Sequence, residues 1–266
     1  RLPRSARIYT GKVDLKSALE ASSNPYFALL AGDYLKNPQE LLTAASDLSF
    51  GRKTLIDLPG EIAGYLPQDI FYNKTGLYSF AIGQHTLVTT PLQAAVMLAA
   101  IANKGHILQP RILKAVYDNT HKIKQEILPK IKNRIFLPGP IRQMILQGMD
   151  LVVSGEKGNA RVNAIKKFWG RPEQSKAYTA MAHQFVGKTS TAELMYNPDI
   201  LPSATACLYK DTWFGAIAFD PASTRWEKPE LVVVIFLKFG DSGTEAAPLA
   251  AQIVQKFRQL KEQNKI

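Results

Sequence analysis

The sequence Gly-Lys-Thr-Ser-Thr-Ala-Glu, at residues 187–193, is the most informative part of this chain. It lies between a polar segment, residues 177–184, and a β-rich run, residues 212–239, and it predicts a strand. A lysine followed by hydroxyl side chains on one strand edge offers a cation and O–H donors in a row, which suits a small carboxylate. Thr189 and Thr191 point to the same face of such a strand. These residues alone leave open an exposed edge strand with polar side chains.

A second stretch, Ala-Ser-Ser-Asn-Pro-Tyr-Phe at residues 21–27, follows a helical segment and places Ser22 two residues before Asn24. Asn24 also fits a helix cap, with Pro25 at the first helical position. A cap alone would explain Asn24, and the pattern Ser-x-Asn is weak evidence for a site by itself.

Together the two stretches resemble the second motif (Ser22-x-Asn24) and the third motif (residues 188–191) of penicillin-binding proteins. Further blocks are similar, in the same order, to class B transpeptidase domains, from about residue 15 to the C-terminus. These blocks are IDLPGE at 56–61, GYLP at 64–67, SFAIGQ at 79–84, TPLQAA at 90–95, AAIANKG at 99–105, PRI at 110–112 and DTWFGA at 211–216. The resemblance implies an α+β fold like that of penicillin-binding proteins and serine β-lactamases, with a helical subdomain packed beside an antiparallel sheet.

The resemblance also implies an activity, serine D,D-transpeptidation, which cross-links peptidoglycan stem peptides during cell wall synthesis and is the target of β-lactams. Ser22 would relay a proton to the leaving amine, and Asn24 would hold the substrate amide. Lys188 would place positive charge near Ser22 and the substrate carboxylate.

The third motif would bind the substrate. The resemblance implies that the hydroxyls of Thr189 and Thr191 bind the terminal carboxylate and that the Thr191 N–H forms half of the oxyanion hole. Ser190 stands where the family usually has glycine. We expect that a side chain there lies on the far side of the strand, against a helix layer, and widens the spacing slightly.

The family's first motif, Ser-x-x-Lys, carries the acylated serine and normally precedes Ser-x-Asn. No such pattern occurs before Ser22, so we expect residues 1–266 to be the C-terminal portion of one transpeptidase domain, inactive alone, with the nucleophile upstream. The pattern does occur at Ser154 and Lys157, but in the wrong order and in a glycine-rich stretch that predicts a loop. About one match is expected by chance, so Ser154 is not predicted to be the nucleophile.

Composition fits this interpretation. The 266-residue chain is 46% hydrophobic, which suits one large domain or most of one. Its net charge of +11 is dispersed and predicts a solvated basic face, as suits a domain near an anionic membrane surface. No aromatic residues interleave with the basic runs, so nucleic-acid binding is not predicted.

The single cysteine, Cys207, allows no disulfide within the chain and predicts a buried thiol. The four histidines have no ligand-like spacing, so no metal or other cofactor is predicted. No apolar run of 18 residues occurs, and the longest, residues 91–102, predicts a buried helix. We expect a periplasmic or extracytoplasmic domain whose membrane anchor lies outside this sequence.

Hydrophobic periodicity and capping residues predict helices and strands at defined places. Helices are expected at residues 13–21, 25–35, 39–48, 91–102, 141–153 and 248–259, and strands at 213–219 and 231–239.

Rival functions share these motifs. A D,D-carboxypeptidase or β-lactamase would carry them, and so would a β-lactam sensor or a non-catalytic scaffold of the cell-wall machinery. The sequence does not distinguish division from elongation, nor does it give the oligomeric state, the β-lactam selectivity, or whether the upstream part is separate, cleaved or omitted.

Overall fold

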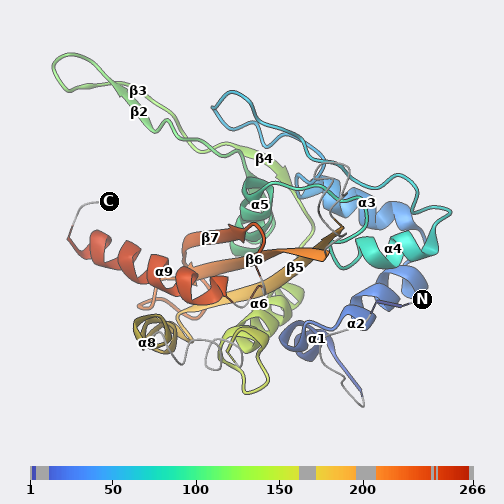
Figure 1. Cartoon of the computed structure of the whole chain (residues 1–266). Helices are drawn as coiled ribbons and strands as arrows, with labels where there is room; N and C mark the ends of the chain where they lie inside the picture. Colours follow the sequence, from blue (N-terminus) through green and yellow to red (C-terminus); the bar gives the residue numbers. More distant parts are fainter. Residues whose placement is uncertain are drawn as a thin grey trace, which may run out of the picture.

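The computed structural model describes residues 2–3, 12–161, 172–195, 208–240, 243 and 245–263 (Figure 1). Cys207 lies outside these residues. The central feature is a three-stranded antiparallel sheet in the order β5-β6-β7. The strands span Phe185–Met195, Leu208–Phe219 and Pro229–Leu237, so both predicted strands and the predicted strand at residues 187–193 are confirmed. Within the described residues, β5 is an edge strand.

Helices cover both faces of this sheet, which makes an α+β layout as predicted. Helix α5 (Pro91–Ala102) packs on one face through Leu98, and α9 (Ala246–Glu262) packs on the other through Val254. Helix α6 (Gly139–Ser154) packs against β5 and contributes to both apolar clusters. Helix α8 (Pro172–Met181) lies beside α9. The period-two alternation of β5 and β6 explains why each face has its own core.

Strand register assigns each residue of the third motif to a face. Lys188 pairs with Gly215, whose backbone closely approaches Leu98 of α5, whereas Thr189 pairs with Phe214, which belongs to the cluster of α9. Directly paired residues share a face. Lys188 and Ser190 therefore lie on the α5 face, and Thr189 and Thr191 lie on the α9 face.

A second group of helices lies at the side of the sheet (Figure 1). It comprises α1 (Leu15–Ala21), α2 (Asn24–Leu29), a π-helical turn η1 (Leu30–Tyr34), α3 (Pro38–Asp47) and α4 (Lys74–Phe80). Buried side chains from several of these elements, among them Leu42, Leu77 and Phe80, form its core. The helix expected at residues 25–35 is thus an α-helix followed by a π-helical turn, a feature that is frequent at functional sites.

The block TPLQ has a structural explanation. Thr90 and Gln93 form a capping box at the start of α5. The Gln93 side chain is fully buried, and its Nε2 donates to the carbonyls of Ser49, Arg52 and Ala63 at 2.7–2.9 Å. Gln93 thereby ties the loops before α4 to the helix under the sheet.

Two small sheets between α5 and α6 were not predicted. Strands β1 (His106–Leu108) and β4 (Ile131–Arg134) pair, as do β2 (Ala115–Tyr117) and β3 (Ile123–Glu126). The β2–β3 hairpin extends far from the body of the molecule (Figure 1).

Candidate active site

Ser22 lies in the tight turn between α1 and α2. Its φ and ψ are both 53°, in the left-handed region that disfavours residues with a side chain by about 1–2 kcal/mol. The Ser22 N–H donates to Leu19 O at 3.1 Å and the Ser23 N–H donates to Ala18 O at 2.9 Å, which is the Schellman pattern of a helix end. A strained non-glycine residue in such a turn is a feature of functional sites.

Lys188 reaches this turn from β5. Its Nζ donates to Ser22 Oγ at 2.7 Å and to Thr189 O at 2.8 Å. Burial lowers the pKa of Lys188 from 10.5 to about 8, because a poorly solvated ammonium is disfavoured. The structure thus brings together two predicted catalytic residues that are 166 positions apart in the sequence.

Close packing of α1 against α6 fixes the position of Ser22 at the end of α1. Gly148 of α6 faces Leu19 of α1 so closely that a Cβ on Gly148 would lie 2.9 Å from Leu19 Cβ. Since α6 also packs against β5, it connects the turn that holds Ser22 to the strand that holds Lys188.

Asn24 is not the helix cap that its position before Pro25 indicated. Helix α2 begins at Asn24 itself, Ser23 occupies the N-cap position, and no side-chain capping bond is made there. The cap interpretation of Asn24 is therefore wrong, and capping does not account for this residue. Asn24 is half-buried two residues after Ser22, and its catalytic role stays a prediction.

Thr189 and Thr191 share a face, as predicted, and their hydroxyls have partners within the chain. Thr189 is only 4% exposed, and its Oγ1 accepts from Asn159 Nδ2 at 3.1 Å. Thr191 is half-buried, and its Oγ1 accepts from the Gly243 N–H at 3.2 Å. Their proposed contact with a carboxylate stays a prediction.

Sequence reasoning missed three residues that surround the third motif. Asn159 and Gly243 contact the two threonines, and Gln84 Nε2 donates to Thr191 O at 3.0 Å. Asn159 stands in the glycine-rich stretch after α6, and Gln84 stands in the block SFAIGQ. For Asn159 and Gln84 the only available signal was their membership of those stretches, and for Gly243 there was none, because each contact joins segments far apart in the sequence.

Ser190 does not pack against a helix layer as expected. It is exposed on the same face as Lys188, so the expectation that it widens strand-to-helix spacing is wrong. Gly243 instead approaches the backbone of Ser190 from the opposite face, where a Cβ on Gly243 would lie 2.4 Å from Ser190 O.

Replacing Ser190 with glycine should leave the fold intact and change the rate of β-lactam acylation. We expect a rate increase of roughly threefold, because the exposed side chain beside Lys188 narrows the approach of a substrate, and small pocket groups have effects of this order. Glycine should lower stability by no more than about 1 kcal/mol. An unchanged acylation rate in the complete domain would contradict this expectation.

The Ser-x-x-Lys match at Ser154 and Lys157 lies at the C-terminal end of a helix. Ser154 is the last residue of α6, and its Oγ donates to Asp150 O at 2.9 Å, a bond within the helix. Arg161 donates to Ser154 O at 3.0 Å, and Lys157 is exposed. Ser154 therefore belongs to the helix and not to the predicted loop, which comprises only residues 155–158, because the buried side chains of Val152 and Val153 continue α6 into the core. The absence of a catalytic role for Ser154 stays a prediction.

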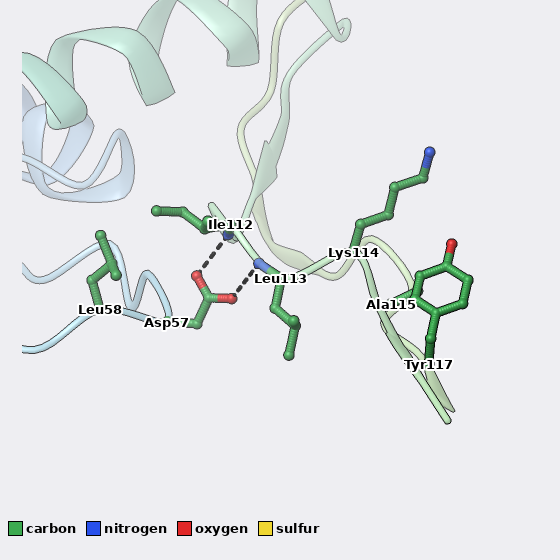
Figure 2. A pocket seen from close by; sticks show the side chains of 7 residues that line it. All are labelled: Asp57, Leu58, Ile112, Leu113, Lys114, Ala115 and Tyr117. Carbon is green, nitrogen blue, oxygen red and sulfur yellow. Dashed lines mark hydrogen bonds between the residues drawn. The ribbon is translucent and has the colours of Figure 1, made fainter. Parts of the chain in front are cut away.

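A pocket of about 450 Å³ lies away from this site, at the base of the β2–β3 hairpin (Figure 2). Asp57, from the block IDLPGE, accepts from the N–H groups of Ile112 at 2.7 Å and Leu113 at 2.9 Å. The Leu113 bond is the main cause that lowers the pKa of Asp57. Asp57 therefore anchors the base of the hairpin, and none of the residues that line the pocket is a predicted site residue.

Among the described residues, none of the helices has the length and apolar character needed to cross a membrane.

Comparison with known proteins assigns the chain to a family. The model of the penicillin binding protein transpeptidase domain matches residues 4–255. The chain is 26% identical to peptidoglycan D,D-transpeptidase MrdA of Haemophilus influenzae, over 93% of this chain and 36% of that protein. It is 25% identical to penicillin-binding protein 2A of Bacillus subtilis, over 94% of this chain and 35% of that protein. The chain thus spans about a third of the length of these relatives.

Solved structures of penicillin-binding proteins also match the chain. Penicillin-binding protein 2 of Pseudomonas aeruginosa, solved in complex with WCK 5153, matches with a TM-score of 0.69 and 25% identity, over 96% of this chain and 54% of that one. Penicillin-binding protein 2B of Streptococcus pneumoniae matches with a TM-score of 0.68 and 23% identity, over 93% of this chain and 39% of that one, and shows the fold. The predicted resemblance is confirmed: the chain belongs to the penicillin-binding protein transpeptidase domain family.

Proposed function

We propose that this chain forms part of a peptidoglycan D,D-transpeptidase domain and supplies the second and third active-site motifs. The observation that carries the proposal is the 2.7 Å contact from Lys188 Nζ to Ser22 Oγ. A lysine whose pKa is lowered to about 8, bonded to a serine held in a strained turn, is suited to move a proton near neutral pH.

The reaction is acyl transfer. A serine oxygen attacks the carbonyl carbon of the penultimate D-Ala of a stem peptide, the C–N bond breaks, and D-Ala leaves with a proton relayed by Ser22. The amine of a neighbouring stem peptide then attacks the ester, forms the cross-link and returns the proton to the serine. A β-lactam acylates the same serine and blocks it.

The nucleophile belongs, in this proposal, to a Ser-x-x-Lys segment in another part of the protein. The span of this chain, about a third of its relatives' length, supports this. The protein acts on the extracytoplasmic face of the cytoplasmic membrane, where its substrate lies, and the net charge of +11 suits that surface.

The third motif binds the end of the donor peptide. Thr191 accepts from Gly243 with its Oγ1, so the hydroxyl proton remains to donate to a carboxylate, and the exposed Ser190 lies beside Lys188. The Thr191 N–H serves as one oxyanion donor, worth about 3 kcal/mol to the transition state. Thr189 is nearly enclosed, so its contribution comes mainly from holding the strand, through Asn159. Asn24 orients the substrate amide.

Labelling with a fluorescent penicillin, followed by a denaturing gel, tests the proposal. In the full-length protein we expect covalent label on the polypeptide that carries Ser-x-x-Lys and none on residues 1–266 alone. Lys188→Ala should lower the labelling rate at least about a hundredfold, while Lys157→Ala, which alters the other motif match, should label normally.

Three outcomes would count against the proposal. Label on residues 1–266 alone would overturn the assignment of the nucleophile. Rapid turnover of nitrocefin would favour a β-lactamase. An unlabelled full-length protein would favour a non-catalytic scaffold.

A further inference from the structure

The side chain of Gln84 contacts the free edge of β5 from outside the sheet. Gln84 Nε2 donates to Thr191 O at 3.0 Å, and the Glu193 N–H donates to Gln84 Oε1 at 3.4 Å. The first of these bonds joins residues 107 positions apart. Gln84 is half-buried in the loop that follows α4.

The two bonds show which groups of β5 face outward. In an antiparallel ladder the N–H and C=O of one residue point to the same side, and neighbouring residues alternate. Thr191 and Glu193 contact Gln84, so they face the free edge, and Thr189, two residues earlier, faces it too. Donating to one carbonyl while accepting from the N–H two residues later is how one residue of an added parallel strand would pair. The Gln84 amide therefore takes the place of a strand at this point.

The loop that presents Gln84 is braced. Both neighbours of Gln84 have positive φ, +77° at Gly83 and +70° at His85, and the second is unfavourable for a residue with a side chain. His85 Nε2 lies 2.6 Å from Asp69 Oδ1, and Asn73, the N-cap of α4, donates to Asp69 Oδ2 at 2.7 Å. These contacts fix the conformation of the loop, so the Gln84 side chain is held in place against the edge of β5.

We propose that Gln84 is a positioning residue that closes the free edge of β5 beyond Thr191. The Thr191 peptide group is then held in one orientation, and the edge of β5 beyond Thr191 is closed to an extended acyl-donor peptide. This inference rests on the proposed function, since it is the Thr191 N–H that would contact the oxyanion. Gln84 touches no reacting atom and acts through Thr191.

Two substitutions separate the two bonds. Gln84→Ala removes both. Gln84→Glu has almost the same shape and still accepts from the Glu193 N–H, but it has no N–H to donate to Thr191 O. Gln109→Ala is the matched control, because Gln109 is also half-buried and also donates to a backbone carbonyl, Leu55 O at 2.6 Å, in another part of the molecule.

In the full-length protein we would measure the acylation rate constant and the non-covalent dissociation constant for penicillin, with amide hydrogen exchange on β5. Both Gln84 variants should slow acylation about tenfold, the equivalent of one lost hydrogen bond, without a matching change in the dissociation constant. Exchange of the Glu193 amide should speed up in Gln84→Ala and stay slow in Gln84→Glu. Gln109→Ala should change neither quantity.

Acylation at the wild-type rate in Gln84→Glu would overturn the inference, and so would unchanged Glu193 exchange in Gln84→Ala. If the wild-type protein is not acylated at all, the proposed function fails, and the exchange data still decide whether Gln84 closes the edge of β5. The two failures are therefore distinguishable.

Discussion

Replacing Lys188 with methionine is expected to raise the free energy of unfolding at pH 7 by about 1–2 kcal/mol while abolishing acylation by β-lactams. Burial lowers the pKa of Lys188 from 10.5 to about 8, which corresponds to a destabilisation of about 3 kcal/mol when the ammonium is charged. The bonds to Ser22 and Thr189 return about 1 kcal/mol each. Methionine fills a similar volume without a buried charge, so stability rises as function is lost.

The sign of the pH dependence follows from proton binding. Between pH 8 and 10.5 the unfolded chain binds a proton at Lys188 that the folded chain does not, so wild-type stability rises with pH across this window. The gain in the free energy of unfolding from Lys188→Met is therefore fully present below about pH 8 and is lost as the pH approaches 10.5. Urea unfolding at pH 7 and pH 10 measures it, with the exposed Lys157→Met as control. A pH-independent difference would contradict the expectation.

Replacing Gly148 with valine is expected to destabilise the protein by about 3 kcal/mol and to slow acylation. Adding a side chain to a helical glycine normally helps the helix, but here the new Cβ would lie 2.6 Å from Leu19 Cδ1 and 2.9 Å from Leu19 Cβ. The Leu19 Cδ1 atom can rotate away, whereas its Cβ moves only with α1. Helix α1 must therefore shift, and Ser22 at its end shifts away from Lys188.

Two further variants isolate this clash. Gly139 begins the same helix, and a Cβ there would meet nothing within 4 Å, so Gly139→Val should cost less than about 1 kcal/mol. Combining Gly148→Val with Leu19→Ala makes room for the new side chain, and the double variant should be more stable than the sum of the single effects predicts. Thermal or urea unfolding measures the five proteins required: the wild type, Gly148→Val, Gly139→Val, Leu19→Ala and the double variant. Simple additivity would mean that contact with Leu19 is not the cause.

Elements with strong local signals were predicted well from the sequence. Helix α5 has an apolar run, a capping box and a proline in its first turn, and it spans the predicted residues. Strand β3 is exposed throughout and has no apolar alternation, so no periodic signal marks it, and the other strands of the two small sheets are also only three or four residues long. A hydrophobic pattern reflects burial, and β2, β3 and β4 contain no buried residue, whereas β1 has only Ile107 buried, too few positions to form a periodic pattern.

The candidate site was predicted in part for a related reason. Ser22 and Lys188 stand in recognisable motifs, but Gln84 and Asn159 join the site only through contacts across the fold. The orientation of Ser190 depends on which face of β5 the helices cover, which the sequence of the strand does not state. Asn24 was misjudged because a proline in a first turn fits more than one helix start.

The contact between Ser22 and Lys188 also has a consequence for synthesis of the chain. At about 5–20 residues per second, the 166 positions between them separate their translation by roughly 8 to 33 seconds. The residues of the turn at Ser22 are therefore synthesised well before Lys188. Contacts of such long range form slowly, because a large loop must first close. The contact between Ser22 and Lys188 can form only after β5 has been synthesised, and a chain truncated before β5 lacks it.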